Sequence, residues 1–180
     1  MEKIRVSKLL SELGLCSRRE ADSYIEQGLV TVDGEPIHEL GTRAYRHQTI
    51  ALRAGAKRQQ EQRLTLLLNK PVGYISHLDD EQQYKPAASL ITPENQFAAA
   101  PDQTQRLHFR GLAPAGRLDI DSSGLLVLTQ DGRIAKLLIG EDSPIEKEYL
   151  VRVSGQLSDA GLRSLQHGLS LDGKALKPAK

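Results

Sequence analysis

The sequence predicts an α+β protein in which a small helical module precedes a larger region of strands and helices. Apolar residues recur at helical spacing near the N-terminus, a turn-bounded alternating strand pattern follows, and helical and strand patterns then interleave to the last residues. The length of 180 residues suits one medium domain, or a small domain and a larger one. Cys16 is the single cysteine, which excludes an intramolecular disulfide and a cysteine-cluster metal site.

The first module is expected over residues 1–53 as two helices and a hairpin. Apolar residues share helical spacing over residues 6–13. Ser17 followed by Glu20 three residues later is a capping-box pattern, which predicts the start of the second helix. The alternating pattern around Asp33-Gly34 predicts a tight hairpin.

A second domain is expected over residues 64–180. Residues 54–63 are polar and aperiodic and are interpreted as a linker, with a short exposed helix as the alternative. Residues 77–106 are polar and irregular, and this is long for a structureless connection, so they form a functional loop or contain a short helix. The other elements predicted in this domain are a strand at Leu64–Asn69, a strand at Leu125–Leu128, a helix at Arg133–Ile139, a strand at Lys147–Val153, a helix from Ser158 to about His167 and a strand over Gly168–Lys177.

Charge and composition restrict the partners. The net charge is +1, with +2 on residues 1–63 and −1 on residues 64–180, so contact with a polyanion must depend on local clusters. The N-terminus has no apolar leader region and no apolar run approaches about 18 residues, which predicts a cytoplasmic protein with no membrane partner. The five histidines show no ligand spacing, so we expect no metal.

The segment Gly116–Gly132 is the most informative one. Arg117, Asp119 and Asp121 lie within five residues, just before a turn and an apolar strand. Charges gathered at the mouth of a strand are typical of a functional site, and the alternative is a charged loop with a weak surface ion pair. A two-carboxylate glycosidase is disfavoured, because an i, i+2 pair does not fix the separation that such chemistry needs. Asp121 is therefore interpreted as structural, bonding the Ser122–Gly124 turn.

The N-terminal module resembles the S4 domain, a small RNA-binding unit. The resemblance lies in Arg5-Val6-Ser7-Lys8, Ser17-Arg18-Arg19-Glu20-Ala21, Ile25, Gly28 and Val30-Thr31-Val32-Asp33-Gly34. It implies that RNA is bound by Arg5, Lys8, Ser17, Arg18 and Arg19. An anion site at the N-terminus of the second helix gives this a physical basis, and the alternative is a solvated helix face.

The second region resembles the pseudouridine synthases of the RsuA/RluF type. The resemblance lies in Asn69-Lys70-Pro71-Val72-Gly73, then Gly116-Arg117-Leu118-Asp119 through Gly132, then Glu146-Lys147-Glu148-Tyr149-Leu150-Val151, in the family's order. It implies a mixed, mainly antiparallel sheet and an isomerase that converts a specific uridine of RNA to pseudouridine without metal or cofactor.

The resemblance also implies a role for each motif residue. Asp119 is the essential catalytic carboxylate, Arg117 pairs with it and holds it ionised, and Tyr149 stacks on the target base. The alternative for Tyr149 is an ordinary strand-core residue. Lys70 is expected to be a scaffold or phosphate contact, and Cys16 a small buried apolar group.

The family's catalytic domain continues beyond the position of Lys180. We therefore expect an incomplete core with an open strand edge, and weak or no activity for these 180 residues alone. The expected substrate is a uridine in a stem-loop of 23S ribosomal RNA, while small-subunit ribosomal RNA and transfer RNA stay open. The alternative function is a non-catalytic RNA-binding protein of the S4 type. The sequence does not give the oligomeric state.

Overall fold

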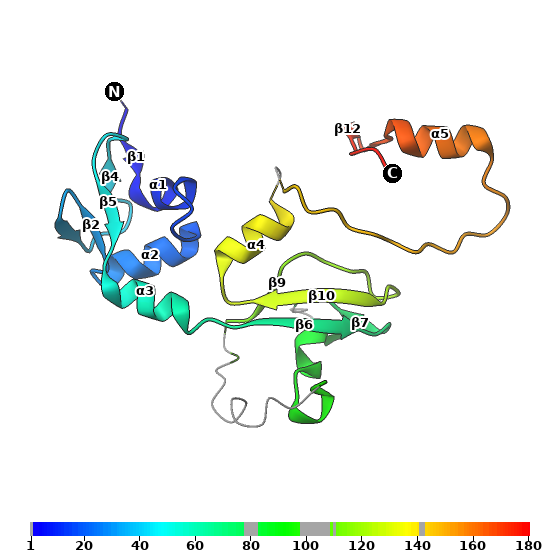
Figure 1. The fold of residues 1–180 in the computed structure, drawn as a ribbon, viewed down its shortest axis with the longest axis horizontal. Coiled ribbons are helices and arrows are strands. Elements are labelled where there is room, and N and C mark those ends of the chain that lie inside the picture. Colours follow the sequence, from blue (N-terminus) through cyan, green and yellow to red (C-terminus); the bar gives the residue numbers. More distant parts are fainter. Residues whose placement is uncertain (1, 78–82, 98–108, 110, 141–142) are drawn as a thin grey trace. The chain divides into compact units, whose positions relative to one another are not determined.

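Two packed helices lie near the start of the chain, as expected (Figure 1). The computed structural model describes residues 2–77, 83–97, 109, 111–140 and 143–180. Helix α1 spans Val6–Glu12 and α2 spans Arg18–Glu26. The predicted capping box is confirmed: the Ser17 hydroxyl accepts a hydrogen bond from the Glu20 N–H, and the Glu20 carboxylate accepts one from the Ser17 N–H. The apolar faces of both helices meet in one core, in which Cys16 is buried as expected.

Five short strands complete this module. They are β1 Ile4–Arg5, β2 Val30–Val32, β3 Glu35–Ile37, β4 Arg43–Ala44 and β5 Ile50–Leu52. Strands β3, β2 and β5 form one antiparallel sheet in that order, and β1 pairs with β4. The predicted hairpin is confirmed, because Asp33 (φ 51°) and Gly34 (φ 90°) both adopt the left-handed backbone that a type I′ turn requires.

The segment interpreted as a linker forms helix α3, Ala54–Glu61, which is the alternative given above. Its one buried residue, Ala56, belongs to the same core as α1 and α2. One buried residue in eight leaves a weak periodic signal, which explains why the pattern favoured a linker.

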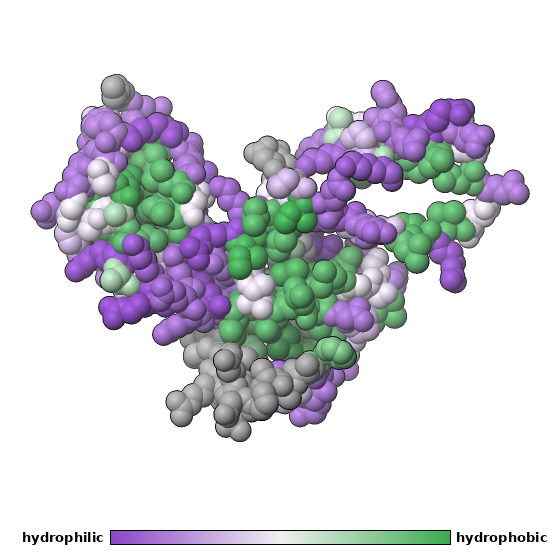
Figure 2. Space-filling view, viewed as in Figure 1, coloured by the Kyte–Doolittle hydropathy of each residue, from purple (hydrophilic) through white to green (hydrophobic). Residues whose placement is uncertain are grey.

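A three-stranded antiparallel sheet forms the centre of the second region (Figure 1). Its strands are β6 Thr65–Lys70, β10 Gly124–Thr129 and β9 Ala113–Pro114, in the order β6-β10-β9, followed by helix α4 Gly132–Ile139. Leu126 and Leu128 face a small core that contains Ala87. On the opposite face Leu67 and Leu125 are exposed, and hydrophobic residues gather over β6 and β10 in Figure 2.

The irregular stretch between β6 and β9 contains short elements where it is described. A two-residue strand β7, Tyr74–Ile75, pairs in parallel with β8, Lys85–Pro86, and two 3₁₀ helices follow, η1 Ala87–Leu90 and η2 Pro93–Asn95. The expectation of a short helix within residues 77–106 is therefore met in the described part. Residues 78–82 and 98–106 lie outside the described residues.

The chain divides into two units, Met1–Ile145 and Glu146–Lys180. The second contains α5, Asp159–His167, which begins at the predicted Ser158 cap and ends at Gly168 (φ 102°). It is followed by a hairpin of β11 Ser170–Leu171 and β12 Lys174–Ala175.

Two predictions for this unit are wrong. Residues Lys147–Val153 form no strand: the segment is exposed throughout, and no strand pairs with it in the described part of the chain. A strand needs a neighbour to bond its N–H and C=O groups, and alternation alone does not supply one. The last segment is a hairpin instead of one strand, because Asp172-Gly173 makes the same left-handed turn as Asp33-Gly34.

Candidate active site

The loop between β9 and β10 carries Asp119, and hydrogen bonds hold its backbone on both sides of that residue. The buried Ser76 hydroxyl donates to the Leu118 C=O (2.6 Å) and accepts from the Leu118 N–H (2.8 Å). The Gly73 N–H donates to the Ile120 C=O (2.8 Å). The residues before and after Asp119 are thus both bonded to the stretch from Gly73 to Ser76, which includes β7.

Lys70 holds that segment in place. Its side chain is fully buried, and Nζ donates to the C=O groups of Pro71 (3.0 Å) and Tyr74 (2.7 Å). Gly73 has a φ of 85°, which strains a residue with a side chain, so this turn depends on glycine. Lys70 therefore acts as a scaffold, in agreement with the expectation, and it spans the turn that bonds the Asp119 loop.

The carboxylate of Asp119 is exposed at the mouth of β10, and so is the guanidinium of Arg117. Among the described residues no ion pair forms between them, so the structure does not contain the expected Arg117–Asp119 pair. Asp121 is exposed as well. Its carboxylate makes no hydrogen bond to residues 122–124 in the described part, and the Ser122 N–H bonds the Asp119 C=O (3.0 Å) instead. The turn is closed by backbone, which corrects the role given to Asp121.

Ser76 is the site residue that the sequence analysis missed. A lone serine in a polar stretch carries no spacing signal. Its contact joins positions 42 residues apart, so only the folded chain shows it. Tyr149 lies in the second unit, in an extended segment where it is 62% exposed.

At the N-terminal module, Arg5, Arg18 and Arg19 are exposed. Lys8 lies 3.7 Å from the carboxylate of Glu12, which compensates part of its charge. At the start of α2 the Ser17 hydroxyl and the Glu20 carboxylate bond each other's N–H groups in the capping box. The Ser17 hydroxyl thus caps the helix in this structure, and its contact with RNA stays a prediction.

Helix α4 begins against the same end of α2. The Gly132 N–H points to Glu20 (3.4 Å), and a Cβ at Gly132 would lie 2.5 Å from Cβ of Ser17. Glu20 also forms an ion pair with Arg63, which donates to the Tyr24 hydroxyl (2.7 Å) and the Gln130 C=O (3.2 Å). These contacts join the end of β10 to α2.

Asp131 caps α4 at this junction. Its carboxylate accepts from the Arg133 N–H (2.9 Å) and from the Arg133 guanidinium. Burial raises the pKa of Asp131, but the hydrogen bonds and the charge of Arg133 outweigh burial and hold this pKa below its ordinary value. The cap is therefore ionised at neutral pH.

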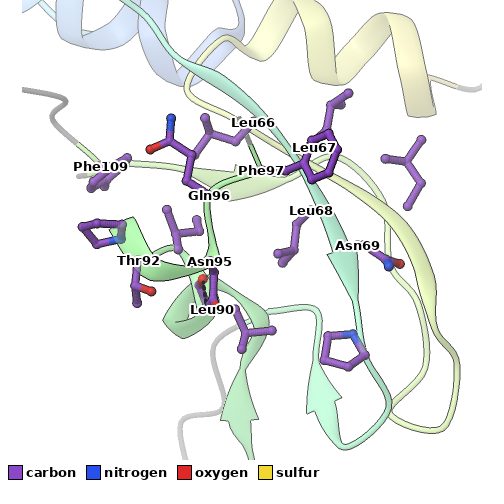
Figure 3. Close-up of a pocket in the computed structure, with 14 residues that line it drawn as sticks. Leu66, Leu67, Leu68, Asn69, Leu90, Thr92, Asn95, Gln96, Phe97 and Phe109 are labelled. Atoms are coloured by element: carbon purple, nitrogen blue, oxygen red, sulfur yellow. Dashed lines mark hydrogen bonds between the residues drawn. The ribbon is translucent and has the colours of Figure 1, made fainter. Parts of the chain in front are cut away.

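An apolar groove of about 740 Å³ runs along β6 (Figure 3). In the close-up Leu66, Leu67 and Leu68 lie along β6, and Phe97 and Phe109 line the same groove. Its lining includes Asn69 and Pro71 but neither Arg117 nor Asp119. A polar base with its phosphates does not match this lining, so the groove is not assigned to the reaction.

Comparison with known proteins decides the family. The model of the RNA pseudouridylate synthase family matches residues 64–172, and that of the S4 domain matches residues 4–44. The chain belongs to the RNA pseudouridylate synthase family. A solved structure described as a pseudouridylate synthase covers 98% of this chain with a TM-score of 0.54 at 23% identity, and the chain covers 71% of it. That likeness confirms the fold class, an α+β chain with mainly antiparallel sheets.

Several curated relatives align over nearly the whole chain. Ribosomal large subunit pseudouridine synthase B of Bacillus subtilis is 35% identical, over 98% of this chain and 66% of the relative. Dual-specificity RNA pseudouridine synthase RluF of Escherichia coli K12 is 31% identical, over 98% of this chain and 56% of the relative. The chain thus spans about 56–66% of the length of these relatives.

Two further findings concern the described residues alone. No helix there has the length and apolar character needed to cross a membrane. No group of three or more histidine, cysteine, aspartate or glutamate side chains gathers there as a metal site would require.

Proposed function

We propose that this protein converts a uridine of RNA to pseudouridine, with Asp119 as the catalytic carboxylate. The bond between the uracil ring and the ribose breaks, the base turns, and the ribose is rejoined to carbon 5 of the base. Asp119 acts as the nucleophile, or as the carboxylate that controls the glycosyl intermediate. The observation that carries the proposal is an exposed carboxylate on a backbone held from both sides by Ser76 and Gly73.

This geometry suits the chemistry. A nucleophile must be accessible to the flipped base and must also be held in a fixed position, because misplacement by about 1 Å is costly. The Asp119 side chain is exposed, while the C=O groups of Leu118 and Ile120 are fixed by hydrogen bonds. Removing a base from its stack costs a few kcal/mol, which favours uridines in loops or weak stems.

Arg117 and Tyr149 are proposed to act on the substrate. Arg117 has no acidic partner among the described residues, so its guanidinium is free to pair with Asp119 or with a phosphate once RNA is bound. Tyr149 is proposed to stack on the target base, for which a rigid aromatic ring is well suited. Arg5, Lys8, Arg18 and Arg19 are proposed to contact RNA phosphates.

The proposed substrate is a stem-loop of 23S ribosomal RNA. The Bacillus subtilis relative carries the ribosomal large subunit in its name, which supports this class. Transfer RNA and small-subunit ribosomal RNA are tested beside it. We propose that the reaction needs neither metal nor cofactor, so chelation with EDTA should leave the rate unchanged. A reaction on ribosomal RNA also fits the cytoplasmic location that the sequence predicts.

Tritium release from 5-tritiated uridine tests the proposal, because rejoining at carbon 5 expels the hydrogen on that atom. Transcripts of each RNA class are incubated with the 180-residue chain, and with any longer product of its gene. The longer wild-type product should release tritium, and the 180-residue chain should release little or none. In the active form Asp119→Asn should abolish release, and Asp121→Asn should retain it. Asp121 is the matched control, since it is an exposed carboxylate in the same loop.

Other outcomes identify a different function. RNA binding without tritium release from any transcript, by either wild-type form, would indicate a non-catalytic S4-type binding protein. Release of free base would indicate a glycosidase. Full activity of Asp119→Asn would refute the role of this residue.

A further inference from the structure

The two-stranded ribbon of β1 and β4 has one face in the core and one face in solvent. The strands pair with Ile4 opposite Ala44 and Arg5 opposite Arg43. Side chains alternate between the two faces of a strand. Ala44 is 1% exposed and Ile4 packs against the same core, so Arg5 and Arg43 both lie on the outer face.

Like charges directly opposite each other destabilise an antiparallel pair. Arg5 and Arg43 occupy such positions, and the Arg43 guanidinium also donates to the C=O of Lys3 (3.3 Å). In the part of the chain that the structure describes, no carboxylate forms an ion pair with Lys3, Arg5 or Arg43. The ribbon and the preceding Lys3 thus present three exposed positive charges without a negative partner. An anion bound across them would reduce their repulsion.

A stacked pair of rings continues this face beyond β4. Tyr45 and His47 lie with ring centroids 5.4 Å apart and ring planes 12° from parallel. The Lys3 ammonium lies 5.2 Å from the centroid of the Tyr45 ring, which joins the stack to the basic ribbon. The His47 ring is exposed, so a further planar group can extend the stack.

The turn that carries the two rings is held by its neighbours. Gln48 bonds Tyr45 twice, through its side chain (2.9 Å) and its N–H (3.1 Å), and its amide donates to Asp33 (2.7 Å). Arg46, which separates Tyr45 from His47 in the sequence, forms an ion pair with Glu12 (2.8 Å). A site arranged before binding avoids the entropy cost of ordering it.

We propose that this surface, made of Lys3, Arg5, Arg43, Tyr45 and His47, binds an unpaired RNA segment next to the substrate stem-loop. Phosphates lie against the three cations, and a base stacks on His47. Planar stacking with flanking cations is the chemistry by which proteins hold single-stranded RNA. The inference rests on the proposed function only in taking RNA as the substrate, and it adds a second contact outside the catalytic loop.

Fluorescence anisotropy tests it without turnover. The 180-residue chain with Asp119→Asn is titrated with two labelled RNAs, a stem-loop with a short single-stranded extension and the same stem-loop with a blunt end. His47→Ala should weaken binding of the extended RNA about tenfold and change the blunt RNA less than about twofold. His47→Phe should restore binding, because it keeps a planar ring.

The salt dependence of RNA binding tests the charged part of the surface. The affinity for the extended RNA is followed against salt concentration, and each lost phosphate contact should reduce the slope of log K against log salt by about 0.7. Arg43→Gln and Lys3→Gln should each show this loss. Arg58→Gln is the matched control, because Arg58 is an exposed arginine on α3, and it should leave the slope unchanged.

Four results would contradict the proposal that this surface binds unpaired RNA. Equal affinities of the wild type for the two RNAs, or an equal loss for both RNAs in His47→Ala, would overturn the inference. So would an effect of Arg43→Gln no larger than that of Arg58→Gln, or a failure of the chain to bind either RNA. Loss of tritium release with this binding pattern intact would refute the catalytic proposal alone.

Discussion

Replacing Ser76 with alanine should loosen the loop that carries Asp119. The hydroxyl makes two hydrogen bonds to the backbone of Leu118, at 2.6 and 2.8 Å, and Ser76 is only 4% exposed. Ser76→Ala leaves an N–H and a C=O without a partner, and each buried unsatisfied group costs about 1–3 kcal/mol. Leu118 is half-buried, so water can reach it in part. We therefore expect a cost near the lower end of the summed range, about 2–3 kcal/mol.

Amide hydrogen exchange measures this effect where it arises. An opening free energy lower by about 2–3 kcal/mol accelerates exchange by about 30- to 150-fold, and the Leu118 amide should show it. The Gly73 amide, which bonds the Ile120 C=O, should exchange faster as well. Ser89→Ala is the control, because it removes one exposed hydrogen bond to Pro86. Unchanged exchange at Leu118 and Gly73 in Ser76→Ala would refute the reasoning.

Two further predictions concern the start of α4. Gly132→Ala places a methyl group 2.5 Å from Cβ of Ser17, and overpacking of this kind should lower the urea midpoint by an equivalent of about 1–3 kcal/mol. Gly161→Ala in α5, where the nearest atom is a flexible leucine end at 3.3 Å, should be neutral or stabilising, and equal midpoints for the two variants would contradict the packing argument. The pKa of Asp131 is lowered in the folded state, so its contribution to stability is complete above the ordinary value of about 3.9 and is lost as the pH falls through the folded pKa. The difference in urea midpoint between the wild type and Asp131→Asn should therefore become smaller as the pH is lowered from 7 to 3. A difference that stays constant over this range would argue against an ionised cap.

Local signals sufficed for much of the fold. The capping box of Ser17 and Glu20 and the turn at Asp33-Gly34 depend on neighbours within four residues, so their geometry follows from a short stretch of chain. The strand predicted at Lys147–Val153 depends on a partner strand, which a single segment cannot reveal. The hairpin at Asp172-Gly173 was missed for a different reason. Its Asp-Gly turn carries the same local signal as Asp33-Gly34, so the sequence could have predicted it.

The sequence predicted only part of the candidate site. The gathering of charges in Gly116–Gly132 pointed to the loop, and the motif resemblance pointed to Asp119 within it. Neither could reveal Ser76, because its bonds to Leu118 cross 42 residues of chain. The capping box also limits what Ser17 can offer an anion, because its hydroxyl accepts from the Glu20 N–H and the Glu20 carboxylate adds a negative charge at the helix start.

The segments Asn69–Gly73 and Gly116–Asp119 cooperate to hold an exposed carboxylate in place. A side chain that must meet a flipped base cannot be fixed by packing around itself, so the restraint has to act on the backbone at either side. The buried ammonium of Lys70 fixes the turn at Pro71–Tyr74, and that turn places Gly73 and Ser76 against the residues flanking Asp119. The segment that follows β6 and the loop that precedes β10 therefore form one structural unit, and β6 and β10 are neighbouring strands. Lys70 belongs to the site for this reason, although its side chain is buried and faces no substrate.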